Sequence, residues 1–349
     1  MSSDKTQKIL VIKPSALGDI ALAMPALASL RKNFPDAEIS WLVRKEFAPL
    51  LEMADELDNI ILFDRKRLGK WYLSPKGFAD LFRFFRTLAS PKFDIVIDLQ
   101  GLFRTALFGW ITGCKKRYGM KGAREFAGLF YNHKVERDSD CVHLVDLNSK
   151  IIAAAGADDI VFDHELTIDS ETRSSYEGLI NECGCGGKKY AVLVTGAAHA
   201  NKCWPVEKFG KLADRLSEQF GLTVITVGTA MDKPAIEKIK GLAKTEIIDL
   251  AGKTSIKVLA AVMREASVIV TNDTGPGHIG EAVSAPIVMI FGPTNPSRVG
   301  PYKKRQCVAA VDAFTRGEKI ESTNPEHSIE KVSVDRVFEK VAALFDENK

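Results

Sequence analysis

The chain has 349 residues, of which 46% are hydrophobic and 27% are charged, a balance typical of a soluble globular protein with room for two domains. Its formal net charge is only +3, which excludes a protein whose overall basic charge binds nucleic acid, so any anion site must be local. No apolar run approaches the length that a membrane-spanning helix needs.

The first half of the chain alternates strand and helix patterns. Residues 9–12 form a short apolar run that predicts a buried strand, and apolar side chains at helical spacing over 20–30 predict a helix after it. Strands that alternate with helices indicate a doubly wound parallel sheet covered on both faces. Further strands are expected at 39–43, 60–63 and 95–99, and a further helix at 78–88 with Leu81, Phe82 and Phe85 on its apolar stripe.

The same alternation restarts after residue 188. The polar stretch between the halves contains three glycines and predicts a linker. We therefore expect an α/β protein of two sheet domains with a cleft between them. The expected strands are 190–194, 222–227, 247–250, 268–270 and 287–291, and the expected helices are 206–220, 256–265 and 333–348. The expected parts are an N-terminal domain (1–180), a linker (181–189), a C-terminal domain (190–330) and a terminal segment (331–349).

Two turns rich in Gly, Pro, Thr and Asp follow consecutive strands of the second half, at 272–278 and 292–296. Ligands of open α/β sheets bind beyond the carboxyl ends of strands, so these turns are placed for binding. Glycines there let backbone N–H groups face outward, and a helix beginning near Gly277 attracts an anion. The alternative for Asp273 is a helix cap. The pattern is neither a Walker loop nor the dinucleotide glycine motif. The candidates in the first turn are Asp273, Thr274, Gly275 and His278.

Two more strand ends carry candidate groups. Lys202 lies late in a small-residue loop after the strand 190–194, where a lysine can meet a diphosphate as a point charge; the alternative is a solvated surface lysine. Asp19 stands where the second predicted element begins, after the strand 9–12. A carboxylate there can accept a proton from an attacking hydroxyl, and the alternative role is an N-cap.

Clustered cations form a further candidate, for an anionic acceptor. They follow a strand or lie among apolar residues, so binding and simple solvation are equally open. An acidic pair, Asp138 and Asp140, predicts a turn or cap more readily than a metal site. The six cysteines are scattered without zinc-ligand spacing and predict reduced thiols. The candidate cations are Arg65, Lys66, Arg67, Lys70, Arg104 and Arg124.

At these residues the sequence resembles the ADP-heptose:lipopolysaccharide heptosyltransferases, glycosyltransferase family 9, over nearly the whole chain. The segment AREFAGLFYN (123–132) looks most like heptosyltransferase I. The resemblance rests on KPSALGD (13–19), DLQGLFRTAL (98–107), NDTGPGH (272–278) and FGPTNPSRVGPY (291–302).

The resemblance implies a GT-B fold of two Rossmann-like domains, with the C-terminal helix returning toward the first. It implies inverting, metal-independent transfer of heptose from ADP-heptose to the Kdo or inner-core region of lipopolysaccharide, with no cofactor. Asp19 matches the catalytic base, Lys202 a phosphate-binding lysine, and Asp232 is a candidate for the ribose. The four candidates of the first turn match the donor site, and the six cations map loosely onto the acceptor site. The sequence departs from the family at Ala197 and Ala198, where threonines are usual.

Several alternatives stay open. The acceptor sugar is either Kdo or a heptose already on the core, as for heptosyltransferases II and III. A nucleotide-sugar epimerase or hydrolase, an NAD-dependent oxidoreductase and a non-catalytic lipid-A-binding module are further candidates; the missing glycine fingerprint after the first strand argues against the oxidoreductase. The N-terminal residues enter a strand pattern directly, so we expect a cytoplasmic protein with transient contact to the inner leaflet and no nucleic-acid partner. No amphipathic anchor is evident.

Overall fold

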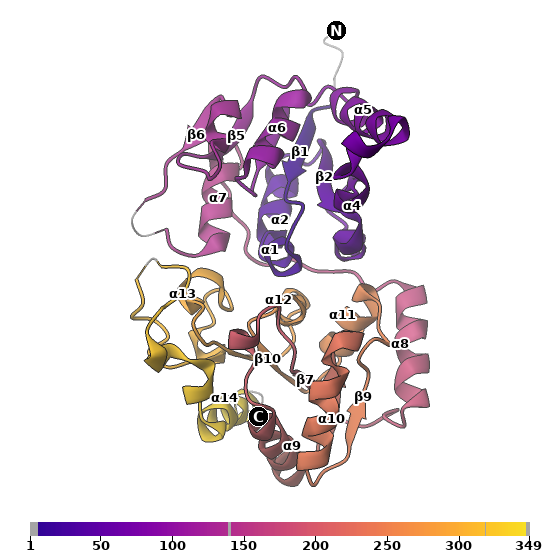
Figure 1. Cartoon of the computed structure of the whole chain (residues 1–349), viewed down its shortest axis with the longest axis vertical. Coiled ribbons are helices and arrows are strands. Elements are labelled where there is room, and N and C mark those ends of the chain that lie inside the picture. The colour runs from indigo at the N-terminus through magenta and orange to yellow at the C-terminus, as the bar shows by residue number, and fades with distance from the viewer. Residues whose placement is uncertain (1–5, 139–140, 318, 347–349) are drawn as a thin grey trace. The chain divides into compact units, whose positions relative to one another are not determined.

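The computed structural model describes residues 6–138, 141–317 and 319–346. The chain divides into two compact units, residues 1–167 and 168–349 (Figure 1). Each unit is built around one six-stranded sheet in which every pairing is parallel. This confirms the predicted α/β class with two doubly wound parallel sheets.

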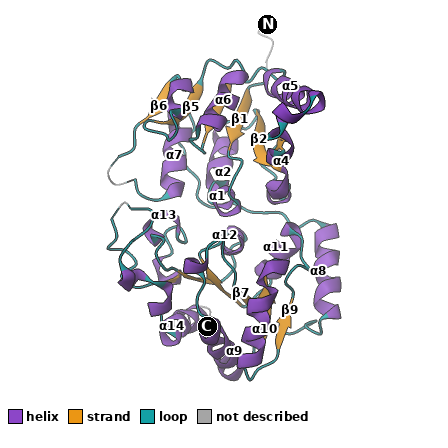
Figure 2. Ribbon diagram, in the orientation of Figure 1, coloured by secondary structure: helices purple, strands orange, loops and turns teal. Residues whose placement is uncertain are grey.

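The first unit has the strand order β3-β2-β1-β4-β5-β6. Helices lie on both faces of this sheet (Figure 2). Its strands are β1 (Lys8–Ile12), β2 (Glu38–Arg44), β3 (Asn59–Phe63), β4 (Ile95–Asp98), β5 (Arg117–Met120) and β6 (His133–Val135). Its α-helices are α1 (Leu17–Ala21), α2 (Met24–Asn33), α3 (Ala48–Leu51), α4 (Arg65–Leu68), α5 (Pro75–Ala89), α6 (Phe103–Ile111) and α7 (Leu144–Ala154), and its 3-10 turns are η1 (Lys45–Phe47), η2 (Trp71–Leu73) and η3 (Ala127–Phe130).

The second unit has the strand order β12-β11-β10-β7-β8-β9. Its strands are β7 (Tyr190–Val194), β8 (Thr223–Val227), β9 (Ile247–Asp249), β10 (Val268–Asn272), β11 (Ile287–Ile290) and β12 (Val308–Ala309). Its α-helices are α8 (Ser170–Glu182), α9 (Val206–Phe220), α10 (Lys233–Leu242), α11 (Ile256–Arg264), α12 (Gly275–Ala282), α13 (Pro296–Val299) and α14 (Val334–Asp346). Its 3-10 turns are η4 (Ala200–Lys202), η5 (Ala230–Asp232), η6 (Arg305–Cys307), η7 (Pro325–His327) and η8 (Ile329–Lys331).

The two sheets share one topology. Numbered within its own unit, each has the order 3-2-1-4-5-6 of dinucleotide-binding folds. The direction of winding reverses between β1 and β4 in the first unit and between β7 and β10 in the second. Loops at the carboxyl ends of these strand pairs diverge and leave room for a ligand, which makes the two reversal points the expected binding positions.

The central strands are apolar along their whole length because helices cover both faces of the sheet. Every residue of β7 and β10 is buried. On one face of the second sheet, α9 contributes Phe209 and Leu212 to the core, and α14 contributes Val337 and Val341. The corresponding core of the first unit packs Phe84 and Leu88 of α5 and Phe108 of α6 against β1, β2, β3 and β4.

Some boundaries differ from those that the sequence predicts. Helix α8 packs against α11, so the division of the chain falls between 167 and 168, ahead of the glycine-rich stretch 181–189. The terminal helix α14 packs against α9, β11 and β12 of the second unit, and its expected return toward the first domain stays a prediction. In α5 the predicted apolar stripe is wrong at Phe82, which is exposed, while Phe84 takes the buried position.

Candidate active site

The loops after β7 and β10 bring two predicted residues together. Lys202, at the end of η4, places its Nζ 2.9 Å from Oδ2 of Asp273, which follows β10 directly. Both side chains are largely buried. The two residues flank the reversal point of the second sheet, so the structure places a cation and a carboxylate where a ligand of this topology binds.

A histidine and a glutamate from α12 extend this pair. His278 Nε2 lies 3.6 Å from Asp273 Oδ1, and its Nδ1 lies 3.5 Å from Glu281 Oε2. The other carboxylate oxygen of Glu281 accepts a hydrogen bond from the backbone N–H of Tyr302 at 2.7 Å. The buried series Lys202–Asp273–His278–Glu281 therefore links the loops after β7, β10 and β11.

The charges of this series stabilise one another. Burial by itself raises the pKa of Asp273, but His278 and Lys202 outweigh it and hold that pKa well below its ordinary value. Burial lowers the pKa of His278, yet Asp273 and Glu281 outweigh it and raise this pKa to about 9. At neutral pH, His278 is therefore an imidazolium between two carboxylates, and both of its ring nitrogens carry a proton.

The loop that carries Lys202 is fixed by a buried amide. The side chain of Asn272 accepts a hydrogen bond from the backbone N–H of Trp204 at 3.1 Å and donates one to the carbonyl oxygen of Thr195 at 2.8 Å. One residue at the end of β10 thus ties both ends of the loop after β7. The indole of Trp204 is buried and donates to the Val332 carbonyl, which anchors the start of α9.

Helix α12 begins at Gly275, two residues earlier than the predicted position. Thr274 is its N-cap residue with an extended backbone, but its side chain makes no capping hydrogen bond. Asp273 is not a cap either, because its carboxylate is held by Lys202 and His278. Gly277 packs closely against the sheet, and the outward direction of its backbone N–H stays a prediction. A Cβ on Gly277 would lie 2.7 Å from Met289 Cε and 2.9 Å from Thr271 Cγ2, so this glycine lets α12 approach the sheet.

A buried arginine stabilises the second turn, which follows β11. Arg316 donates to the carbonyl oxygens of Gly292 and Thr294, at 2.6 and 2.8 Å. Thr294 also pairs with Glu321, whose Oε1 lies 3.9 Å from Lys202 Nζ. The hydroxyls of Thr195 and Thr294 are buried without a hydrogen-bond partner among the described residues, a costly state that water or a ligand relieves.

Asp232, the candidate for a ribose contact, lies beside the same edge of the sheet. Its Oδ2 accepts hydrogen bonds from the backbone N–H and the hydroxyl of Thr229, at 2.7 and 2.9 Å. A Cβ on Gly196 or Gly228 would meet this carboxylate, so Asp232 lies against the loops after β7 and β8. Its ribose role stays a prediction.

In the first unit, Asp19 lies on α1, immediately after β1. Its side chain is 37% exposed, and its Oδ2 lies 3.5 Å from Nζ of Lys13 and 3.3 Å from the backbone N of Ala16. Lys13 is buried and also donates to the carbonyl oxygen of Leu99 at 3.2 Å. Asp19, the candidate base, is therefore partly exposed to solvent, and the buried ammonium group of Lys13 lies next to it.

The loop after β4 supports the loop after β1. The carboxylate of Asp98 accepts hydrogen bonds from the hydroxyls of Tyr131 and Thr105, at 2.7 and 2.8 Å, and from the backbone N–H of Gln100 at 2.9 Å. Burial raises the pKa of Asp98, and these hydrogen bonds act against that rise. The Gln100 side chain in turn accepts from the backbone N–H of Ser15 at 3.3 Å. Asp98 thus has a structural role at the reversal point of the first sheet.

The candidate acceptor cations fall into two groups. Arg65, Lys66 and Arg67 lie on α4 with Lys70 just after it, and all four are exposed. Arg67 is already held by Asp80, with Nε 2.7 Å from Oδ2. The second group is Arg104 on α6 and Arg124 before η3, both exposed on segments that contact each other.

Other predicted features have simpler explanations. Among the described residues, no cluster of three or more His, Cys, Asp or Glu side chains is arranged to hold a metal ion. Asp138 forms an ion pair with Lys150, whereas residues 139 and 140 lie outside the described part of the chain. The six cysteines form no disulfide among the described residues. Within the described ranges, no helix combines the length and apolar character needed to cross a bilayer.

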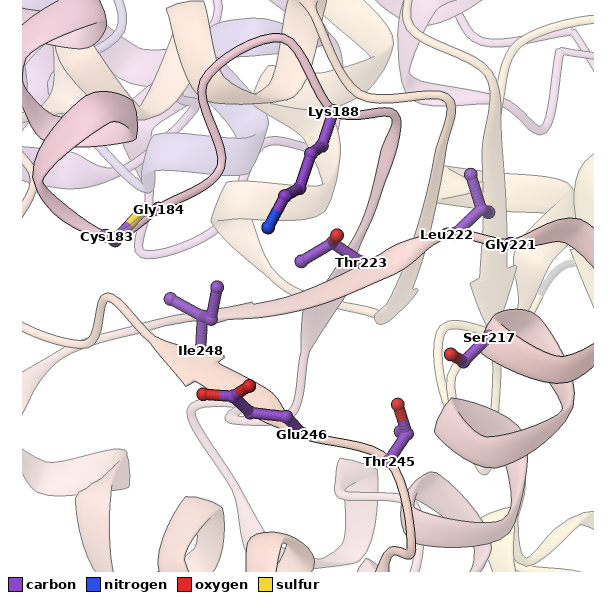
Figure 3. A pocket seen from close by; sticks show the side chains of 10 residues that line it. All are labelled: Cys183, Gly184, Lys188, Ser217, Gly221, Leu222, Thr223, Thr245, Glu246 and Ile248. Atoms are coloured by element: carbon purple, nitrogen blue, oxygen red, sulfur yellow. The ribbon is translucent and has the colours of Figure 1, made fainter.

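A cavity of about 400 Å³ lies in the second unit, away from these groups (Figure 3). It borders Thr223, the first residue of β8, and Glu246, which precedes β9, so it opens at the amino ends of the strands. Lys188 and Cys183 also line it. Because ligands of such sheets bind at the carboxyl ends, we assign the candidate site to the loops of Lys202 and Asp273.

Three residues of this site are not among the candidates that the sequence predicts. Asn272 lies inside the motif at 272–278, but the strand predicted before it ends at 270, so its place as the last residue of β10 gave no signal. Lys13 directly follows an apolar strand that ends at Ile12. A lysine buried at such a position needs a partner of opposite charge, and this need was the available signal. Glu281 stands three residues after His278 on a helix, the spacing at which side chains meet.

Comparisons with known proteins agree with this geometry. The family model of glycosyltransferase family 9 (heptosyltransferase) matches residues 81–329. Lipopolysaccharide heptosyltransferase 1 of Escherichia coli is 26% identical over 93% of this chain and 99% of its own. Lipopolysaccharide heptosyltransferase 3 of the same species is 26% identical over 80% of each chain.

A solved structure extends the agreement to the fold. The crystal structure of the family 9 glycosyl transferase from Veillonella parvula superposes with a TM-score of 0.80 at 25% identity and covers 98% of this chain and 97% of its own. The predicted GT-B fold, with two Rossmann-like units, is thereby confirmed. The matched region contains the loops of Lys202, Asp273 and the turn after β11. The chain therefore belongs to glycosyltransferase family 9, the heptosyltransferases, and is a glycosyltransferase.

Proposed function

We propose that this enzyme transfers heptose from ADP-heptose to the Kdo or inner-core region of lipopolysaccharide, with inversion at the anomeric carbon. The observation that carries the proposal is the buried Lys202–Asp273–His278 arrangement at the reversal point of the second sheet. The family membership and the names of the two relatives support the donor and acceptor classes.

In this proposal the second unit holds the diphosphate of the donor. Lys202 supplies a positive charge, and the first backbone N–H groups of α12, at Thr274 and Gly275, supply donors at the positive end of a helix. As the bond to the sugar breaks, charge builds on the departing ADP. Groups that are fixed beforehand stabilise this charge more in the transition state than in the ground state.

Asp19 is the proposed general base. An acceptor hydroxyl oxygen forms a bond to the anomeric carbon from the face opposite the diphosphate. The bond from that carbon to the phosphate oxygen breaks, ADP leaves with the electron pair, and the hydroxyl proton moves to the Asp19 carboxylate. This sequence inverts the anomeric centre. It requires donor and acceptor to be bound at the same time with water excluded.

The proposal includes no metal ion and no cofactor, because Lys202 and the α12 N-terminus take the role of neutralising the diphosphate. It also places the enzyme in the cytoplasm, at the inner face of the inner membrane, where a lipid-linked acceptor is reached. The cations on α4 and beside α6 are the proposed acceptor contacts, except Arg67, which Asp80 already holds.

A mass-spectrometric transfer assay tests the reaction. The enzyme is incubated with ADP-heptose and either Kdo-lipid A or heptosylated Kdo-lipid A, each with and without a chelator. We expect a mass increase of one heptose on one acceptor, unchanged by the chelator. Transfer that stops in chelator and returns with a divalent ion rejects the metal-free mechanism, and absence of transfer to both acceptors rejects the proposed activity.

Two alternatives are separated by the same assay. Because relatives of types 1 and 3 are equally identical to this chain, an acceptor that already carries heptose is the second candidate, and the two acceptor arms decide between them. A nucleotide-sugar epimerase or hydrolase consumes ADP-heptose without an acceptor. Equal donor loss with and without acceptor would favour that alternative.

A further inference from the structure

Five large apolar side chains are exposed together at one corner of the first unit. They lie on η2 and on α5, which contact each other beside α4 (Figure 1). Their exposed fractions range from 43% to 69%. Single exposed apolar residues are common, whereas a contiguous group marks a binding surface. This group, called the aromatic patch below, consists of Trp71, Tyr72, Leu73, Phe78 and Phe82.

The patch is contiguous because its rings come from adjacent turns. The Trp71 ring centroid lies 6.1 Å from that of Tyr72 and 6.4 Å from that of Phe78. Phe78 and Phe82 are four residues apart on α5 and therefore share one face of the helix. The opposite face of α5 packs Phe84 and Leu88 into the core. Helix α5 is thus apolar both toward the core and toward solvent.

Positive charge surrounds the patch. Residues 65–86 contain seven lysines and arginines but one acidic residue, Asp80. Asp80 is buried, and its carboxylate oxygens lie 2.7 Å from Arg67 Nε and 2.8 Å from Arg83 Nη1. Hydrogen bonding to Arg67 lowers the pKa of Asp80, so this acid remains charged and holds one arginine of α4 and one of α5, the helix that carries Phe78 and Phe82. The cations of the segment are Arg65, Lys66, Arg67, Lys70, Lys76, Arg83 and Arg86, all of them exposed.

Aromatic rings next to lysine and arginine form the surface that anchors proteins in the headgroup region of anionic membranes. A second copy of this chain would bring one set of seven cations against another, which like-charge repulsion opposes. An anionic lipid surface complements both the rings and the charge. We propose that the aromatic patch and its flanking cations bind the surface of an anionic lipid bilayer.

The biological role of this membrane binding rests on the proposed function, because a lipid-linked acceptor lies in the surface of a bilayer. The rings enter the boundary between headgroups and acyl chains, and the cations meet lipid phosphates. No amphipathic anchor is evident in the sequence because α5 also carries apolar residues on the face that packs into the core. The two apolar faces of α5 are distinguished by the structure, in which Phe84 is buried and Phe82 is exposed.

Vesicle flotation of the full-length protein tests the surface. The probes are vesicles of phosphatidylcholine alone and of phosphatidylcholine with phosphatidylglycerol. We expect binding to the anionic vesicles that weakens as salt is raised. Phe78→Ser/Phe82→Ser should weaken binding about tenfold or more, and Lys76→Glu/Arg86→Glu should weaken it by a comparable factor, about fivefold for each cation removed.

The matched control is Leu242→Ser, which removes an apolar side chain 53% exposed on the second unit. It should bind vesicles as the unsubstituted protein does, and all variants should keep the same Tm. If Phe78→Ser/Phe82→Ser binds anionic vesicles as tightly as the control, the assignment is wrong. A dimer in sedimentation that this double substitution abolishes, with no vesicle binding by the unsubstituted protein, would identify the patch as a contact between copies and overturn the proposal.

Ring insertion has its own measurement. The chain has four tryptophans, of which Trp41 and Trp204 are fully buried. In a Trp110→Phe background, Trp71 is the remaining exposed indole. Brominated lipids should quench its fluorescence on vesicle binding. Bound protein without quenching would contradict insertion of the patch.

Transfer assays separate this inference from the proposed function. Phe78→Ser/Phe82→Ser should transfer normally to a deacylated, water-soluble acceptor and more slowly to the same acceptor embedded in anionic vesicles. Equal loss on both acceptors would point to a defect at the active site and contradict a membrane role. Absence of transfer to any acceptor would reject the proposed function and leave the flotation result to decide the membrane surface.

Discussion

The two units share one strand order but carry their charges differently at the reversal point of the sheet. In the second unit, Lys202, Asp273, His278 and Glu281 form a buried series in which each charge has an opposite neighbour. In the first unit, Asp19 is partly exposed, and its cation Lys13 lies beneath it. In the second unit the charged groups are paired with one another, whereas in the first unit a carboxylate is presented to solvent.

This difference suits two different tasks. A leaving diphosphate is stabilised best by groups that are already oriented, because reorganising them during the reaction costs free energy. A general base must instead reach a substrate proton and exchange it with water afterwards. The same topology therefore supports charge stabilisation in one unit and proton transfer in the other, depending on how deeply the ionisable groups are buried.

The largest predicted effect separates these tasks at Asp19. Asp19→Asn removes the proposed base but keeps the shape of the side chain, so kcat should fall by about 100- to 10,000-fold. ADP binding should stay unchanged, because the proposed diphosphate site lies in the other unit. Steady-state kinetics and calorimetry measure the two quantities.

The control for Asp19→Asn is Asp36→Asn, which removes an exposed carboxylate from a turn of the same unit. It should leave kcat unchanged. A nearly normal kcat for Asp19→Asn would remove Asp19 from the chemistry, and the contrast between the units would lose its functional meaning.

The buried series of the second unit predicts how stability depends on pH. His278 has a pKa of about 9 in the folded protein, above its ordinary value of 6.5. Its protonated form therefore stabilises the fold. This contribution is complete below about pH 6.5 and is lost as pH rises through about 9, and it amounts to about 3 kcal/mol of unfolding free energy. Urea unfolding of the second unit at several pH values measures it.

His278→Gln isolates this contribution from other titrating groups. The amide keeps a hydrogen-bonding side chain between Asp273 and Glu281 but carries no charge, so the variant should be less stable at pH 6 and should approach the unsubstituted protein near pH 10. A constant difference between the two proteins across this range would show that His278 is not charged in the folded state.

The sequence predicts the central, buried strands of each sheet better than the strands near the sheet edges. The strand at 190–194 was predicted with the bounds that β7 has, because a parallel strand buried on both faces is apolar throughout. The strands β5 and β6 were not predicted. Their sequences, RYGM and HKV, are short and partly polar, and β6 lies at the edge of its sheet. Their pairing depends on neighbours that a local pattern does not contain.

The candidate site shows the same division. Lys202 and Asp273 were each singled out by their loops, but their ion pair joins residues 71 positions apart and depends on the pairing of β7 with β10. Helical periodicity also placed Phe82 in the core, since a helix with two apolar faces has no single stripe. Burial decides such cases, and burial is a property of the assembled unit.

A smaller effect tests the buried series of the second unit from the ligand's side. Lys202→Met removes the cation but keeps most of the side-chain volume, so ADP should bind about 10- to 100-fold more weakly, the range for losing a charge-assisted contact. Lys211→Met, on the exposed side of α9, is the matched control and should bind ADP normally. Calorimetry that finds equal ADP affinity for the two variants would exclude Lys202 from the diphosphate site.

The smallest effect distinguishes two neighbouring cations on α4. Lys66 is exposed and available to an anionic acceptor, whereas Arg67 is held by Asp80. Lys66→Ala should raise KM for a water-soluble acceptor by up to about fivefold, the range for an exposed charge pair, without changing Tm. Arg67→Ala should lower Tm, because Asp80 is buried and loses one of its two partners, while KM changes little. A larger rise in KM for Arg67→Ala than for Lys66→Ala would contradict this assignment. It would mean that the acceptor binds Arg67 and displaces Asp80 from it, so that part of the acceptor site in the first unit is an ion pair before the acceptor binds.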